Sequence, residues 1–126
     1  MWQQYNPNPK GLQVGDCVIR ALAKATGKTW EQVYIALCVE GLGMCDMPSA
    51  NRVWGHWLQE QGFKRNFLPD ACPSCYTVAQ FTADHPSGLF ILCMDGHVAC
   101  VEDGSIFDTW DSSERVPLYY WIKEES

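Results

Sequence analysis

Apolar side chains recur at helical spacing through the first part of the chain. A stripe at positions i, i+3, i+4 and i+7 is made by Val18, Ala21, Leu22 and Ala25. This stripe predicts a helix that begins after Asp16 and ends at Gly27. Residues 1–15 contain two Asn-Pro pairs, which favour turns and extended chain over helix.

Three further helices are indicated by their start and stop signals. Residues 29–32, Thr-Trp-Glu-Gln, form a capping box and predict a helix to about Glu40, ending at Gly41. Pro48-Ser49 opens a third helix that stops at Gly62. A second capping box at 77–80 predicts a short helix ended by residues 85–88.

The pattern changes to strands in the last third of the chain. Turn signals Asp95-Gly96 and Asp103-Gly104 separate short apolar or alternating runs. The predicted strands are 89–94, 97–102, 105–110 and 116–123, with an earlier candidate at 64–68. Helices followed by an antiparallel meander define an α+β class. We therefore predict N-terminal helices packed on a C-terminal antiparallel β-meander, as one domain over residues 1–126.

Composition and charge exclude several classes of function. The chain of 126 residues has a formal net charge of −6, and its basic residues are scattered, which argues against a nucleic-acid partner. No apolar run approaches the roughly 20 residues of a membrane span. The first residues lack the pattern of a signal peptide, and an odd count of seven cysteines suggests free thiols. We expect a cytoplasmic protein without membrane partner, metal or cofactor.

Cys17 stands at the start of the first predicted helix. The unpaired N–H groups and the positive end of the helix dipole favour the thiolate there, and cysteine reactivity follows the thiolate. A packed helix cysteine is the alternative, and it is the better interpretation of Cys17 taken alone.

A histidine and a carboxylate are predicted to meet across two neighbouring strands. If Asp103-Gly104 is a two-residue turn, His97 and Asp108 share one face and are diagonal neighbours. The carboxylate would fix the imidazole tautomer and leave its other nitrogen for a thiol. Trp110 lies on the same face and would shield the pair from water. A register slip of one residue would move Asp108 to the opposite face.

These residues, taken in order, resemble a minimal papain-like cysteine peptidase. The resemblance rests on Gly15-Asp16-Cys17-Val18-Ile19-Arg20-Ala21-Leu22-Ala23, Gly96-His97-Val98-Ala99 and Asp108-Thr109-Trp110, and covers residues 11–26 and 76–121. It implies that Cys17 is the nucleophile, His97 the general base and then acid, and Asp108 the group that orients His97. In this family the third member is typically the Asn of an Asn-Ser-Trp motif, or an Asp. Small bacterial and phage domains of unassigned specificity look similar.

The resemblance fails at the oxyanion donor. The family usually has Gln six residues before the nucleophile, where this chain has Gly11. Gln13, Asn6 and Asn8 remain candidates, of which we choose Gln13, together with the backbone N–H of Cys17.

The resemblance implies a cysteine hydrolase that forms a thioester with a peptide, isopeptide or other amide, most simply in a protein substrate. The alternative is a catalytically inactive binding protein on the papain fold, such as a phage-encoded modulator of a host protein. A third hypothesis is an interaction module held by zinc through Cys72 and Cys75, although a loop with two free thiols is favoured. Oligomeric state and specificity are left open.

Four other polar residues receive structural interpretations. Asp111 faces away from His97 by strand alternation, and Asp16 is assigned as a helix N-cap. His56 is assigned to packing or to an exposed helix face, and His85 to a helix C-cap.

Overall fold

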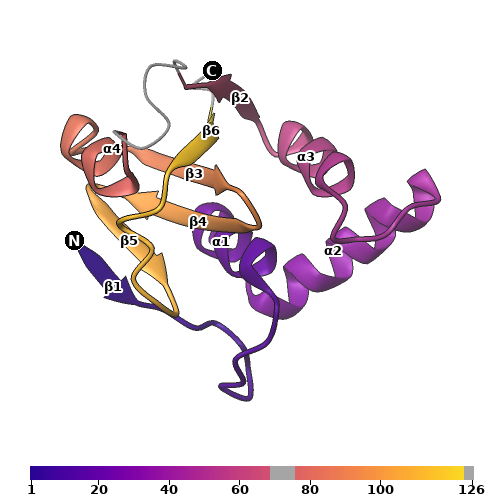
Figure 1. The fold of residues 1–126 in the computed structure, drawn as a ribbon. Coiled ribbons are helices and arrows are strands. Elements are labelled where there is room, and N and C mark those ends of the chain that lie inside the picture. The colour runs from indigo at the N-terminus through magenta and orange to yellow at the C-terminus, as the bar shows by residue number, and fades with distance from the viewer. Residues whose placement is uncertain (69–75, 124–126) are drawn as a thin grey trace.

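The computed structural model describes residues 1–68 and 76–123 and has the α+β class that the pattern predicts (Figure 1). Within these ranges the helices are α1 (Cys17–Thr26), α2 (Trp30–Met44), α3 (Asn51–Glu60) and α4 (Val78–Asp84). The strands are β1 (Trp2–Gln4), β2 (Phe63–Phe67), β3 (Leu89–Met94), β4 (His97–Glu102), β5 (Ser105–Asp108) and β6 (Pro117–Lys123).

The six strands form one mixed sheet in the order β1-β5-β4-β3-β6-β2. Strands β3, β4 and β5 are the predicted antiparallel meander, but β6 returns beside β3 instead of following β5. Strand β1 pairs parallel to β5, with Trp2 opposite Ile106, so the expectation of a purely antiparallel sheet was wrong. All three residues of β1 are exposed, and no apolar core contact marks them in the sequence, so no local apolar pattern could reveal this strand.

Helices cover both faces of the sheet, and each face has its own core (Figure 1). Helices α1, α2 and α3 pack on one face, where Ile91, Cys93, Val98 and Cys100 point. Helix α4 packs on the other face, against Phe90, Leu92, Met94, Ala99 and Val101. This alternation along β3 and β4 explains why both strands are nearly continuous apolar runs.

Helix boundaries agree with the sequence signals except around α2 and α3. Both capping boxes form, and Gly27 ends α1 in the left-handed conformation. Helix α2 continues past Gly41 and ends at Met44, so the prediction that the helix ends at Gly41 was wrong. A Cβ at Gly41 would lie 2.7 Å from the backbone oxygen of Asp46, so the residue allows the following loop to approach the helix. Helix α3 begins at Asn51, later than the predicted start at 48–49.

None of the helices in the described ranges has the length and apolar character that a membrane-spanning helix requires.

Candidate active site

Three chain segments converge where α1 begins. Cys17 is the first residue of α1, His97 the first of β4 and Asp108 the last of β5. The β4–β5 hairpin has the register that the Asp-Gly turn predicts, with Glu102 opposite Ser105 and Cys100 opposite Phe107. The fold therefore brings the end of β5 beside the beginning of β4, and His97 lines one cleft with the first residue of α1 and with the residue that follows β5.

His97 and Asp108 form a short hydrogen bond inside the protein. The distance from Nε2 of His97 to Oδ2 of Asp108 is 2.6 Å, and the two residues are 7% and 1% exposed. Because Nε2 is taken by the carboxylate, Nδ1 is the nitrogen left for a second partner. The Trp110 ring lies 4.6 Å from the imidazole, centroid to centroid, and covers it on one side while remaining partly exposed.

That second partner is the thiol of Cys17. Burial raises the pKa of this thiol, but the hydrogen bonds from His97 and from the backbone N–H of Val98 outweigh it. The charges of His97 and Arg20 act in the same direction, so the net pKa lies below the ordinary thiol value. Cys17 is half-buried and remains accessible from outside.

The pKa of the His97 imidazole shifts upward, opposite to the shift of the Cys17 thiol. Burial lowers the pKa of His97, whereas its hydrogen bonds to Asp108 and Cys17 raise it, and the pKa rises to about 9. A lowered thiol pKa beside a raised imidazole pKa favours a thiolate–imidazolium pair near neutral pH. This is the protonation state in which a cysteine attacks without first losing a proton.

Every lone-pair direction of the Asp108 carboxylate is used. Oδ2 accepts from His97 and from the Ser112 hydroxyl at 3.2 Å, while Oδ1 accepts from the Thr109 backbone N–H and from Arg20. Burial raises the pKa of Asp108, but the bonds to His97 and Thr109 and the charge of Arg20 bring it below its usual value. The carboxylate is therefore ionised and fixed in orientation.

Arg20 is the residue that joins α1 to this carboxylate. Its Nη2 lies 3.1 Å from Oδ1 of Asp108, and its Nη1 donates to Oδ1 of Asp16. The other oxygen of Asp16 accepts from the indole N–H of Trp30 at 2.8 Å. Asp16 is the N-cap residue of α1, as predicted, but its side chain makes no capping bond, because its carboxylate binds Arg20 instead.

The N-terminal strand also supports Asp108. The backbone oxygen of Asp108 accepts from the Tyr5 backbone N–H at 2.9 Å and from the Trp2 indole at 3.2 Å. Strand β1 and the residue that follows it therefore fix the main chain at Asp108, the residue that carries the carboxylate.

A cleft of about 380 Å³ opens over these groups. Its lining includes Cys17, Arg20, His97 and Trp110, together with Gln13. The other two candidate oxyanion donors do not line the cleft: Nδ2 of Asn6 donates to the Leu12 carbonyl, and Oδ1 of Asn8 accepts from the backbone N–H of Lys10. Gly11, at the position of the family's glutamine, is exposed and has no side chain to donate. Gln13 is therefore the candidate donor that borders the cleft.

The other described cysteines lie in different surroundings. Cys93 and Cys100 are buried in strands, where burial raises the pKa of Cys93 to about 12 and also raises that of Cys100. Cys38 and Cys45 are exposed on α2 and at its C-cap. The proposed zinc ligands Cys72 and Cys75 lie outside the described residues.

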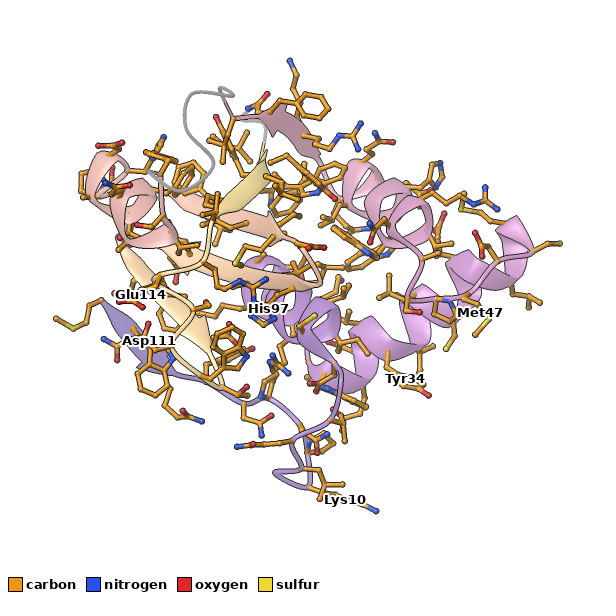
Figure 2. The ribbon with its side chains drawn as sticks, viewed as in Figure 1. Lys10, Tyr34, Met47, His97, Asp111 and Glu114 are labelled. Carbon is orange, nitrogen blue, oxygen red and sulfur yellow. The ribbon has the colours of Figure 1, made fainter. Side chains whose placement is uncertain are left out.

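The remaining polar candidates do not join the site. Figure 2 shows Asp111 well separated from His97, and its carboxylate accepts from the Ser113 backbone N–H. Nδ1 of His85 donates to the Phe81 carbonyl at 2.9 Å, at the C-terminus of α4.

One further group could ligate a metal in the part of the chain that the structure describes. Glu40, His56 and Glu60 place their ligating atoms within 4.8 Å of one another, on α2 and α3. Nδ1 of His56 lies 2.5 Å from an oxygen of Glu40 and 3.8 Å from an oxygen of Glu60, so contacts between the histidine and these two carboxylates account for the group without an ion.

Sequence reasoning missed Arg20, Ser112, Trp2 and Trp30. Of these, only Arg20 leaves a local signal: it interrupts an apolar run and follows Asp16 at the i,i+4 spacing of helix ion pairs. Comparisons of the chain with protein-family models, curated proteins and solved structures gave no match. The functional argument therefore depends on the geometry of the site.

Proposed function

We propose that this protein is a cysteine hydrolase that cleaves an amide bond through Cys17, His97 and Asp108. The observation that supports this most directly is the chain of contacts from the Cys17 thiol through the imidazole to a buried carboxylate. Each group alone has an ordinary structural explanation. Their linear arrangement beneath an open cleft is what a thiol nucleophile, its acid–base partner and an orienting group require.

In the acylation step, Sγ of Cys17 attacks the carbonyl carbon and forms a C–S bond. The C–N bond then breaks, and the leaving amine takes the proton from Nδ1 of His97. Water next attacks the thioester while His97 takes one of its protons. The C–S bond breaks, the carboxylic acid leaves and Cys17 returns to its starting state. Asp108 holds the ring and stabilises its positive charge throughout.

The tetrahedral intermediate needs hydrogen-bond donors for its oxyanion. The first N–H groups of α1 have no acceptor within the helix, so the backbone N–H of Cys17 can supply one donor. The Nε2 group of Gln13 supplies the second in this proposal, because its residue borders the cleft beside the thiol.

The papain-like resemblance and the architecture support the same class. The nucleophile begins a helix that packs on an antiparallel hairpin carrying the other two members, and the order Cys, His, Asp follows the family. Asp108-Thr109-Trp110 stands where the family has Asn-Ser-Trp, with the Trp110 ring over the imidazole. The proposed substrates are peptides, isopeptides or other amides, and a cytoplasmic location fits the free thiol.

Selective alkylation tests this proposal before any substrate is known. With iodoacetamide at limiting dose and peptide mapping by mass spectrometry, Cys17 should react well before the exposed Cys38 and Cys45. A library of fluorogenic peptide amides then tests turnover, with Cys17→Ala as the inactive control and Cys45→Ala as the matched active one. Slow, uniform alkylation of the exposed thiols and Cys17 would contradict the proposal.

A catalytically inactive binding protein is the second candidate. It is favoured by an exposed apolar stripe on α2, formed by Ile35, Val39 and Leu42, which are 62%, 65% and 81% exposed. Contiguous apolar surface of this kind commonly contacts a partner. Fast alkylation of Cys17 with no turnover of any amide in the library would favour this candidate over the hydrolase.

A further inference from the structure

A hollow of about 440 Å³ is lined by α3 and by the strands β2 and β6, on the face of the sheet that α1, α2 and α3 cover. The described residues that line it all differ from those that line the cleft over Cys17. One stripe of α3 forms a wall of this hollow, and its residues are Asn51, Arg52, Gly55, His56 and Gln59. Figure 1 shows α3 leading directly into β2, so a short stretch of chain supplies both of these elements.

The strand side of the hollow is built around Trp121. A Cβ at Gly55 would lie 3.3 Å from Cζ2 of Trp121, so the glycine lets α3 approach the indole closely. On the neighbouring strand Arg65 is paired with Trp121, and Phe67 with Tyr119. Cross-strand partners point to the same face, and the guanidinium carbon of Arg65 lies 5.0 Å and 5.5 Å from the centroids of the Phe67 and Tyr119 rings. The aromatic rings therefore hold this guanidinium beside the indole.

The charged side chains that line the hollow are cationic or can become so. They are Arg52, Arg65 and His56, and none of the described lining residues is acidic. This composition is unusual in a chain whose formal net charge is −6. Asn51 adds an amide N–H donor, because its Oδ1 already accepts from the Trp54 indole at 3.1 Å. The lining is thus rich in groups that donate hydrogen bonds to an anion.

The Trp121 indole is a further donor, and it lacks an ordinary acceptor. The residue is 4% exposed, and its Nε1 forms no hydrogen bond to any described residue. The Cys93 thiol lies beside the indole, but a thiol sulfur is only a weak acceptor. Buried N–H groups nearly always have a partner, and one without a partner in the protein is commonly satisfied by water or an ion.

The surrounding carboxylates decide how much negative charge the hollow suits. Nε of Arg52 lies 2.6 Å from an oxygen of Asp46, and His56 lies between two glutamates. Arg65 has no carboxylate at ion-pair distance among residues 1–68 and 76–123. One uncompensated cation suits a ligand group with a single negative charge. A carboxylate carries that charge and accepts two parallel N–H bonds from an arginine.

We propose that this hollow binds a carboxylate, either of a free organic acid or of an acidic peptide side chain, with Arg65 as its ion-pair partner. The α3 amides and the Trp121 indole are the further donors. The volume leaves room for the rest of the ligand, since sites for small molecules range from about 300 to 1,000 Å³. This binding activity goes beyond the proposed hydrolysis and does not depend on it.

The test is a titration followed by two-dimensional NMR at the indole N–H resonance of Trp121, assigned from triple-resonance spectra. The probes are propionate and N-acetylglutamic acid α-amide, which should both shift this resonance to saturation. N-acetylglutaminamide has nearly the same shape without the charge and should not shift it. Tighter binding of the glutamic acid derivative than of propionate assigns the site to peptide side chains, and the opposite order assigns it to free acids.

Two substitutions on β2 separate Arg65 from the general charge of the surface. Arg65→Gln should raise the Kd for N-acetylglutamic acid α-amide at least about tenfold, because hydrogen bonds to a charged group are lost. Lys64→Gln is the matched control: it removes the same charge from the adjacent exposed residue, which does not line the hollow, so the Kd should change little. Arg65→Lys keeps the charge without the fork of donors and should give an intermediate Kd.

Three results would overturn the proposal. The first is that neither carboxylate shifts the Trp121 resonance. The second is that inorganic phosphate shifts it at a lower concentration than either carboxylate, which would assign the hollow to another class of anion. The third is that Lys64→Gln weakens binding as much as Arg65→Gln. The alkylation of Cys17 tests the hydrolase separately, so each proposal can fail without the other.

Discussion

The protein contains two histidine–carboxylate groups that differ in what surrounds them. His56 lies between Glu40 and Glu60 on the surface of α2 and α3, and its side chain is 51% exposed. His97 lies against Asp108 inside the protein, with the Cys17 thiol on its other nitrogen. Both histidines have a carboxylate at about hydrogen-bonding distance, so an acid beside an imidazole does not by itself define a site.

The two histidine–carboxylate groups differ in their burial and in the thiol that only His97 has beside it. Exposed ion pairs contribute little because water and salt screen them. Asp108 instead accepts four hydrogen bonds away from solvent and is held by Arg20. Only the buried group can fix an imidazole in one orientation and keep it charged beside a thiol.

The largest expected effect comes from removing each imidazole in turn. His97→Gln should lower kcat/KM for a cleaved peptide amide by about 10²–10⁴-fold, because the proton donor and acceptor of the reaction is lost. His56→Gln should leave kcat/KM unchanged. Steady-state kinetics of the two variants checks the comparison, which fails if both substitutions have similar effects.

Removing the carboxylate beside each histidine should change the free energy of unfolding of the protein by very different amounts. Asp108→Ala leaves Arg20 buried with one partner fewer, and breaking a buried pair of this kind typically costs about 3–5 kcal/mol. Glu40→Ala should change the free energy of unfolding little, because the group is at the surface. Urea unfolding monitored by circular dichroism measures both, and a stable Asp108→Ala protein would contradict the role given to this ion pair.

The pH profile tests the charge on His97. The pKa of His97 is raised to about 9, and in the proposed reaction the imidazolium donates the proton to the leaving group, so kcat/KM should fall as the pH rises through about 9. Asp108→Asn removes the charge that stabilises the imidazolium, so the alkaline fall of kcat/KM should occur at a pH lower by about one pH unit or more. An unchanged alkaline fall in folded Asp108→Asn would show that the carboxylate does not act on His97.

The smallest effect is expected at the indole that covers the imidazole. Trp110→Ala removes a ring contact worth about 0.5–1.5 kcal/mol, so kcat/KM should fall by roughly two- to tenfold. Trp110→Phe keeps an aromatic cover and should retain most of the activity in the same assay. The opposite ranking of these two variants would refute a shielding role.

The local pattern predicted the parts of the site that depend on neighbouring residues. A two-residue Asp-Gly turn fixes the register of β4 and β5, and that register places His97 and Asp108 on one face. The N-terminus of α1 follows from the apolar stripe that begins at Val18. These are short-range consequences of backbone geometry.

The missed contacts are those between segments far apart in the chain. Arg20 reaches Asp108 across 88 positions and Trp2 reaches its backbone across 106, and neither contact has a periodic signal in the sequence. The parallel pairing of β1 with β5 also joins segments that are far apart in the chain. Such contacts depend on how helices and strands pack against one another, and the periodicity of apolar residues along the chain does not predict that packing.

The reactivity of Cys17 as a function of pH tests the central claim most directly. An ordinary exposed thiol loses about tenfold in alkylation rate for each pH unit below its pKa, since only the thiolate reacts. Between pH 8 and pH 6 the iodoacetamide rate of a small reference thiol such as glutathione should therefore fall by roughly a hundredfold, and that at Cys17 by less than about tenfold. His97→Gln should give Cys17 the steep dependence of the reference thiol. An equally steep fall for Cys17 in the unmodified protein and for the reference thiol would show that no thiolate–imidazolium pair exists.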